Sequence, residues 1–66
     1  MEKVIKTEKI TEYLIKTGYS QGEFCKLCKV STATFQKIMQ QDCNFGVKAL
    51  FRIARQMEIR VCDLLV

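Results

Sequence analysis

Apolar residues recur at helical spacing along this chain, whereas the alternating pattern of a β-strand is scarce. No proline interrupts the pattern, and the three glycines fall at positions 18, 22 and 46. The spacing predicts five short helices, over residues 7–16, about 21–29, about 32–40, from Val47 onward, and 61–65. Because short connections join them, we expect a compact all-α domain. For residues 1–6 the sequence leaves three possibilities open: an extension of the first helix, a frayed end, or a short strand.

Cap signals mark several of these helix ends. Gly18 follows the first helix, where a C-cap glycine is expected. Ser20 and Glu23 have the spacing of a capping box, in which each side chain accepts a hydrogen bond from the other residue's amide. Ser31 is expected to cap the third helix. The apolar spacing then predicts the buried face of each helix: Ile10 and Leu14; Phe24, Cys25 and Cys28; Phe35 and Ile38; and Val47, Leu50, Phe51 and Ala54.

The length of the chain, 66 residues, permits a single domain over residues 1–66 and no enclosed substrate cavity. Hydrophobic residues make up 48% of it and charged residues 27%, which is typical of a folded globular protein. Histidine is absent and no nucleophile–base pair is evident, so we expect no enzyme, no cofactor and no small-molecule substrate. The sequence has no secretion signal, and its apolar runs are far shorter than the roughly 20 residues of a membrane span. We therefore expect a cytoplasmic protein without membrane contact.

The formal net charge is +4, and its distribution matters more than its size. No acidic residue lies between Phe24 and Gln41, whereas Lys26, Lys29 and Lys37 all fall within that segment. A lysine-bearing segment without acids suits a polyanionic partner, and the alternative is an ordinary solvated face.

Four cysteines, at positions 25, 28, 43 and 62, allow three interpretations. A structural zinc site usually takes two close ligand pairs, but Cys25 and Cys28 are the only close pair and fall within a predicted helix. A redox pair requires a βαβ context and a thiol at a helix start, and the pattern has neither. Buried free cysteine behaves as a small hydrophobe. We therefore expect Cys25 and Cys28 to pack in the core, with no bound metal.

Residues 21–38 resemble the helix-turn-helix of the Cro/CI-type (XRE) family of phage and bacterial repressors. The family pattern begins with glutamine, has an apolar and then a small residue at its fourth and fifth positions, and has apolar residues at its eighth, tenth, fifteenth and eighteenth. This chain has, in that order, Gln21, Phe24, Cys25, Cys28, Val30, Phe35 and Ile38. Residues 50–59 resemble the family's fourth helix, and residues 61–65 resemble its closing short helix. The resemblance implies a five-helix, lambda-repressor-like DNA-binding domain with its helix-turn-helix at about residues 20–40.

The chain departs from the family pattern at several positions. Lys29, Gln41 and Glu58 occupy places where the family commonly has glycine. A residue with a Cβ pays on the order of 1 kcal/mol if a left-handed conformation is required there. Leu14 and Met39 stand where the family often pairs an arginine with a glutamate, so an apolar contact is expected to replace a buried ion pair.

Burial of the apolar stripe of the third helix turns four residues outward: Thr32, Ala33, Gln36 and Lys37. Glutamine can bond adenine, lysine can donate to guanine, and the methyl groups of threonine and alanine can touch thymine, so we expect these residues to contact bases. The resemblance also implies base contacts at Thr32, Ala33 and Lys37. It implies phosphate contacts, which fix register without conveying sequence, at Ser20, Gln21, Thr34 and Gln40.

Together these features predict a small Cro/CI-like transcriptional regulator, acting as a repressor, that binds double-stranded DNA with residues 32–40 in the major groove. One such module offers little contact area, so we expect a homodimer formed through the C-terminal run Leu64-Leu65-Val66 or through Leu27. The alternative is a protein-interaction module, such as an antitoxin or an accessory partner with the same fold. The outward apolar residues Leu27 and Val66 favour that alternative.

Overall fold

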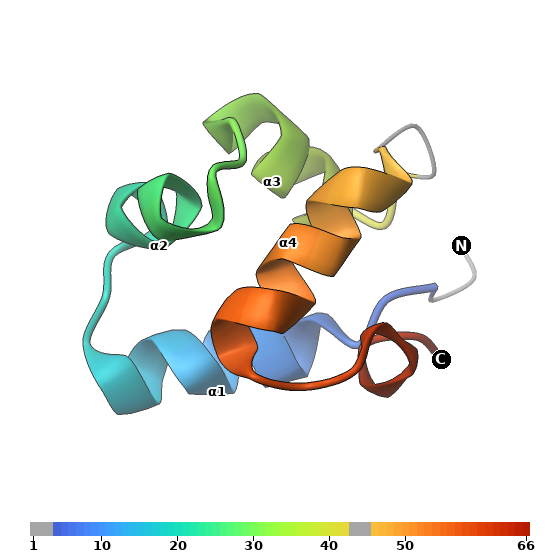
Figure 1. Cartoon of the computed structure of the whole chain (residues 1–66), viewed down its shortest axis with the longest axis horizontal. Helices are drawn as coiled ribbons and strands as arrows, with labels where there is room; N and C mark the ends of the chain where they lie inside the picture. Colours follow the sequence, from blue (N-terminus) through green and yellow to red (C-terminus); the bar gives the residue numbers. More distant parts are fainter. Residues whose placement is uncertain (1–3, 43–45) are drawn as a thin grey trace.

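Four α-helices and a 3₁₀ turn make up the fold in a computed structural model that describes residues 4–42 and 46–66. They are α1 (Thr7–Thr17), α2 (Gln21–Cys28), α3 (Thr32–Met39), α4 (Val47–Met57) and the 3₁₀ turn η1 (Val61–Asp63). Within the described residues there is no β-strand, which confirms the all-α class. The molecule measures 29 × 20 × 18 Å, and α4 crosses its centre in the view of Figure 1. Of the helices described, none has the length and apolar character to cross a membrane.

Helix ends follow the cap signals of the sequence. The Ser20 hydroxyl accepts from the Glu23 amide at 3.2 Å, and the Glu23 carboxylate accepts from the Ser20 amide at 3.2 Å, which confirms the capping box. The Ser31 hydroxyl accepts from the Thr34 amide at 3.1 Å and so caps α3. Gly18 ends α1 with a left-handed φ of 79°, a conformation that glycine adopts without strain.

The core lies where the inner faces of the helices meet. Phe24 of α2 is fully buried, and its ring lies 5.5 Å from that of Tyr13 and 5.9 Å from that of Phe35, so it joins α1, α2 and α3. The edge-on arrangement with Phe35 is one that aromatic quadrupoles favour. Cys25 and Cys28 are buried, which confirms their packing role. The other buried residues are Ile5, Ile10, Val30, Ile38, Ala49, Leu50, Ile53, Ala54 and Leu64.

The predicted buried face of α4 is wrong in part. Leu50 and Ala54 are buried as expected, but Val47 is 64% exposed and Phe51 is 57% exposed. Ala49 and Ile53 are buried instead. They flank Leu50 and Ala54 on the side of the helix opposite to Val47 and Phe51. Apolar residues cover more of the circumference of α4 than the core can bury, and spacing alone does not select which part turns inward.

The two ends of the described chain pair with each other. Ile5 and Leu65 form an isolated antiparallel bridge, the Lys6 amide donates to the Leu64 carbonyl at 2.7 Å, and the Val66 amide donates to the Val4 carbonyl at 3.0 Å. Residues 4–6 are therefore extended and do not continue α1. The expected last helix over residues 61–65 is a 3₁₀ turn that ends at Asp63, and Leu64 is wholly buried in the core.

Three non-glycine residues of the described chain adopt the left-handed conformation, and they stand at the common glycine positions of the Cro/CI pattern. Their φ angles are 59° at Lys29, 63° at Gln41 and 59° at Glu58. Each bears the cost of that conformation, about 1–2 kcal/mol for a residue with a Cβ. Leu14 and Met39, at which we expected an apolar contact, are partly buried against the core.

The Gln41 side chain fastens the N-terminal segment to the end of α3. Its Oε1 accepts from the amides of Val4 at 2.9 Å and Ile5 at 2.7 Å, and its Nε2 donates to the Ile5 carbonyl at 2.8 Å. One polar side chain thus satisfies three backbone groups of a segment far away in sequence. Cys43, expected in the loop before α4, lies outside the described residues.

Candidate nucleic-acid interface

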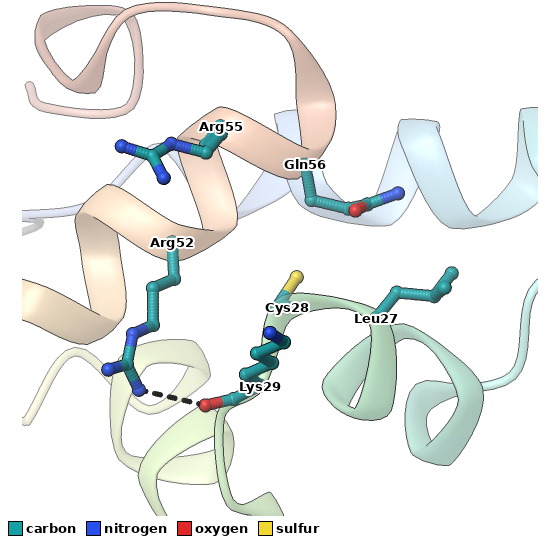
Figure 2. Close-up of a pocket in the computed structure, with 6 residues that line it drawn as sticks. All are labelled: Leu27, Cys28, Lys29, Arg52, Arg55 and Gln56. Carbon is teal, nitrogen blue, oxygen red and sulfur yellow. Dashed lines mark hydrogen bonds between the residues drawn. The ribbon is translucent and has the colours of Figure 1, made fainter.

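The segment from Ser20 to Gln40 contains two helices joined by a tight turn. After α2 ends at Cys28, the left-handed Lys29 reverses the chain, and the Val30 amide donates to the Cys25 carbonyl at 3.0 Å. Val30 is buried and holds the turn against the core. Arg52 of α4 adds a bond from outside, since its Nη1 donates to the Lys29 carbonyl at 3.0 Å (Figure 2).

The four predicted base-contacting residues are all exposed on α3: Thr32, Ala33, Gln36 and Lys37. On the opposite side of this helix Phe35 is 1% exposed and Ile38 is fully buried. The helix therefore presents a polar outer surface without an acidic residue while its apolar side is anchored in the core. Whether these side chains contact bases stays a prediction.

The four predicted phosphate-contacting residues lie at the ends of the same two helices. Ser20 caps α2, Gln21 begins it, and Gln40 follows the last residue of α3; all three are exposed. Thr34 is half-buried, and its hydroxyl accepts from the Ser31 hydroxyl at 2.9 Å. Each of these side chains carries at least one hydrogen-bond donor, a hydroxyl or an amide N–H.

A hydrogen bond links the two predicted sets. Gln36 Nε2 donates to Gln21 Oε1 at 3.1 Å, so a residue expected to contact bases is held by one expected to contact phosphate. This bond was not predicted from the sequence. The 15-residue separation gives no local signal in the sequence, because the bond joins α2 to α3 across the turn.

The cations of this segment are exposed as well. Lys26, Lys29 and Lys37 all lie at the surface, within a stretch that contains no acidic residue. Glu23, the acidic residue next to this stretch, uses its carboxylate to cap α2. The surface of α2 and α3 beyond that cap therefore carries lysines and no carboxylate, a charge pattern that a polyanionic partner would complement.

Cys25 and Cys28 are buried as free thiols. Burial raises the pKa of the Cys25 thiol, and burial followed by the neighbouring Cys25 raises the pKa of Cys28 to about 11. Both stay protonated at neutral pH, whereas metal binding and thiol exchange use the thiolate. Among the described residues, no three histidine, cysteine, aspartate or glutamate side chains lie close enough to hold a metal ion.

Comparison with family models, with curated proteins and with solved structures finds no match to this chain. The resemblance to the Cro/CI family thus rests on residues 21–38, 50–59 and 61–65 of the sequence.

Proposed function

We propose that this protein binds double-stranded DNA sequence-specifically, as a small Cro/CI-like transcriptional regulator that represses by occluding a promoter. The observation that carries the proposal is the outer surface of α3, where Thr32, Ala33, Gln36 and Lys37 are exposed and no acidic residue is present. A helix of this kind fits the major groove and presents its N-terminal residues to base edges.

Gln36 has the donor and acceptor that adenine recognition requires. One of its two N–H groups donates to Gln21. The other N–H can donate to adenine N7, and the side-chain carbonyl oxygen can accept from adenine N6. The bond to Gln21 also limits the rotamers of Gln36 before DNA arrives, and such preorganisation lowers the entropy cost of binding. Lys37, one residue further on and also exposed, would donate to guanine.

Phosphate contacts would hold the helix in register. The Ser20 hydroxyl accepts from the Glu23 amide, so its own proton is free to donate to a phosphate oxygen. The Gln21 amide N–H groups are free in the same way, because only its oxygen is used by Gln36. Thr34 and Gln40 would add donors along the same strand.

The backbone supports a lambda-repressor-like assignment of the fold. Lys29, Gln41 and Glu58 adopt left-handed φ angles at three places where the Cro/CI pattern commonly has glycine. Residues with a Cβ avoid this conformation unless the surrounding fold demands it, so the agreement extends over the turns as well as the helices.

A dimer would give the module useful affinity. One module of this size buries about 600–1,000 Å² on DNA, and a two-fold dimer would read half-sites about 34 Å apart. Leu64 is buried in its own core and is not available for the interface we expected at the C-terminal run. Leu65 and Val66, 38% and 72% exposed, remain candidates, as does Leu27.

The test is selection of binding sites from a random double-stranded DNA library at fixed salt, with a chelator present. We expect enrichment of a two-fold symmetric motif with half-sites about 10 bp apart. On the enriched site, Lys37→Ala should cost about 1–3 kcal/mol and relax the preference at one base pair. Lys16→Ala, which removes a cation from α1, is the control and should leave the preference unchanged.

A second candidate function is a protein-interaction module, which the 46% exposure of Leu27 on α2 favours. If no sequence is enriched above background, the DNA proposal fails and this candidate takes its place. Loss of sequence preference in Lys37→Ala separates the two, because a protein-binding module has no base preference to lose.

A further inference from the structure

The outward side of α4 combines exposed apolar side chains with clustered cations. We define the α4 face as Val47, Lys48, Phe51, Arg52 and Arg55. Phe51 is 57% exposed and Val47 is 64% exposed, and the helix carries three cations and no acidic residue. A single exposed apolar residue is common, but an aromatic ring next to a valine and among three cations is a specific chemical surface.

Shallow depressions flank this face, and Arg55 lines three of them. The first, about 200 Å³, is lined by Lys48, Phe51, Arg52 and Arg55. The second, about 390 Å³, extends toward the C-terminus and is lined by Phe51, Ala54, Arg55, Ile59, Arg60 and Val61. The third, about 370 Å³, lies between the end of α2 and α4 and is lined by Leu27, Cys28, Lys29, Arg52, Arg55 and Gln56 (Figure 2).

The charges of the lining residues indicate which kind of partner fits the α4 face. Among the described residues that line the three depressions there are five cations, at positions 29, 48, 52, 55 and 60, and no carboxylate. A second copy of the chain would bring the same cations against each other, and like charges in contact oppose association. A DNA backbone would satisfy the cations but would leave Phe51 and Val47 uncovered.

We infer that the α4 face docks an acidic, amphipathic peptide segment of a partner protein. Carboxylates of that segment pair with Arg55, Lys48 and the free edge of Arg52, and a large apolar side chain covers Phe51. Arginine suits this role because its planar fork binds a carboxylate through two bonds and also stacks on aromatic rings. Leu27, exposed at the far edge of the third depression, offers a second apolar contact.

This surface is separate from the proposed DNA-reading surface, which lies on α3. The two surfaces meet at Lys29, which lines the third depression and also belongs to the positively charged surface of α2 and α3, and whose carbonyl accepts a hydrogen bond from Arg52. The inference does not depend on DNA binding and goes beyond it: a regulator that holds DNA with α3 would still present α4 to a protein partner.

The test is a selection from a random peptide library displayed on phage, against the immobilised full chain and without DNA. We expect enrichment of peptides that combine several aspartates or glutamates with an aromatic or large aliphatic residue. Isotope-edited NMR of the chain with a synthetic copy of the best peptide should then shift the amides of α4 more than those of α1.

Matched substitutions locate the contact. Phe51→Ser and Arg55→Glu alter exposed side chains and should each weaken peptide binding at least about tenfold. Ile15→Ser and Lys16→Glu are the matched controls on α1: each replaces an exposed apolar residue by serine or an exposed cation by glutamate, and Ile15 is 77% exposed. Both should leave peptide binding within about twofold of the wild type. Circular dichroism checks that all four variants remain folded.

Four results would overturn the inference. The first is a selection that enriches no acidic consensus, and the second is an acidic peptide that binds the Phe51→Ser and Arg55→Glu variants as tightly as it binds the wild type. The third is concentration-dependent self-association of the chain that Phe51→Ser abolishes. The fourth is a loss of affinity for duplex DNA in Arg55→Glu that is the same on every DNA sequence. The third would assign the face to a second copy, and the fourth would assign it to phosphates. Failure of the DNA proposal would appear only in the duplex selection, so the two outcomes are distinguishable.

Discussion

Glycine substitutions at Lys29 and Gln41 are expected to shift the free energy of unfolding in opposite directions, although both residues hold left-handed backbone, with φ angles of 59° and 63°. Glycine relieves about 1–2 kcal/mol of steric cost at such a position, and its greater freedom in the unfolded chain takes back about 0.5–1 kcal/mol. The Lys29 side chain is exposed, and the bond from Arg52 goes to its backbone carbonyl, which glycine retains. Lys29→Gly should therefore stabilise the fold by about 0.5–1 kcal/mol.

Gln41→Gly gains the same relief but loses the side chain that accepts from Val4 and Ile5 and donates to Ile5. Each hydrogen bond contributes about 0.5–1.5 kcal/mol net, so the set is worth about 3 kcal/mol. Gln41→Gly should therefore lower the free energy of unfolding by about 2 kcal/mol, because residues 4–6 lose their attachment to the end of α3.

Thermal and urea unfolding followed by circular dichroism measure both effects. In a domain of this size, Tm should rise by about 2–8 °C for Lys29→Gly and fall by about 8–16 °C for Gln41→Gly. Lys29→Ala removes the same side chain but keeps the strained backbone, so its free energy of unfolding should stay within about 0.5 kcal/mol of the wild type. If both glycine variants raised the Tm, the Gln41 bonds would contribute less to stability than the relief of the left-handed backbone, well below the expected value of about 3 kcal/mol. Two decreases would refute the assignment of strain to these turns.

Two further predictions concern the cap of α2 and the thiols. Ser20→Ala should cost about 1 kcal/mol of stability, visible as a lower Tm, because its hydroxyl and the Glu23 carboxylate form one reciprocal cap; an unchanged Tm would contradict it. In the folded protein an alkylating reagent should modify exposed Cys62 rapidly and leave Cys25 and Cys28 unmodified until urea is added, which mass spectrometry detects. Burial raises the pKa of Cys28 to about 11, so the folded state favours the protonated thiol. The stabilisation from this protonated thiol is complete below the ordinary thiol pKa of about 8.5, and it declines as the pH rises from there toward 11.

Local signals in the sequence were enough to predict the helices and most of their ends. The capping box, the Ser31 cap and the C-cap at Gly18 depend on residues within one turn of each other, so their sequence spacing nearly determines their geometry. The burial of Phe35 and Ile38, and with it the outward direction of the predicted base-contacting set, follows in the same way from helical period.

Contacts between distant segments were not predictable in the same way. The Gln41 side chain bonds residues that precede it by 36 and 37 positions, and the Gln36–Gln21 bond joins two helices across the turn. Polar side chains on a helix surface have many possible partners, and only the three-dimensional arrangement selects one. Leu64 shows the same limit, because its burial depends on the pairing of the two ends of the chain.

The prediction that failed on α4 bears on function as well as folding. Periodicity places Val47 and Phe51 on the same stripe as Leu50 and Ala54, yet the core has room for only one side of that stripe. Val47 and Phe51 bury less than half of their surface in the fold, and together they form an exposed apolar patch on α4. The three cations on the same helix would repel those of a second copy, and this repulsion opposes pairing of the surface with itself. Val47 and Phe51, which the fold leaves exposed among three cations, are the residues from which we infer an acidic protein partner.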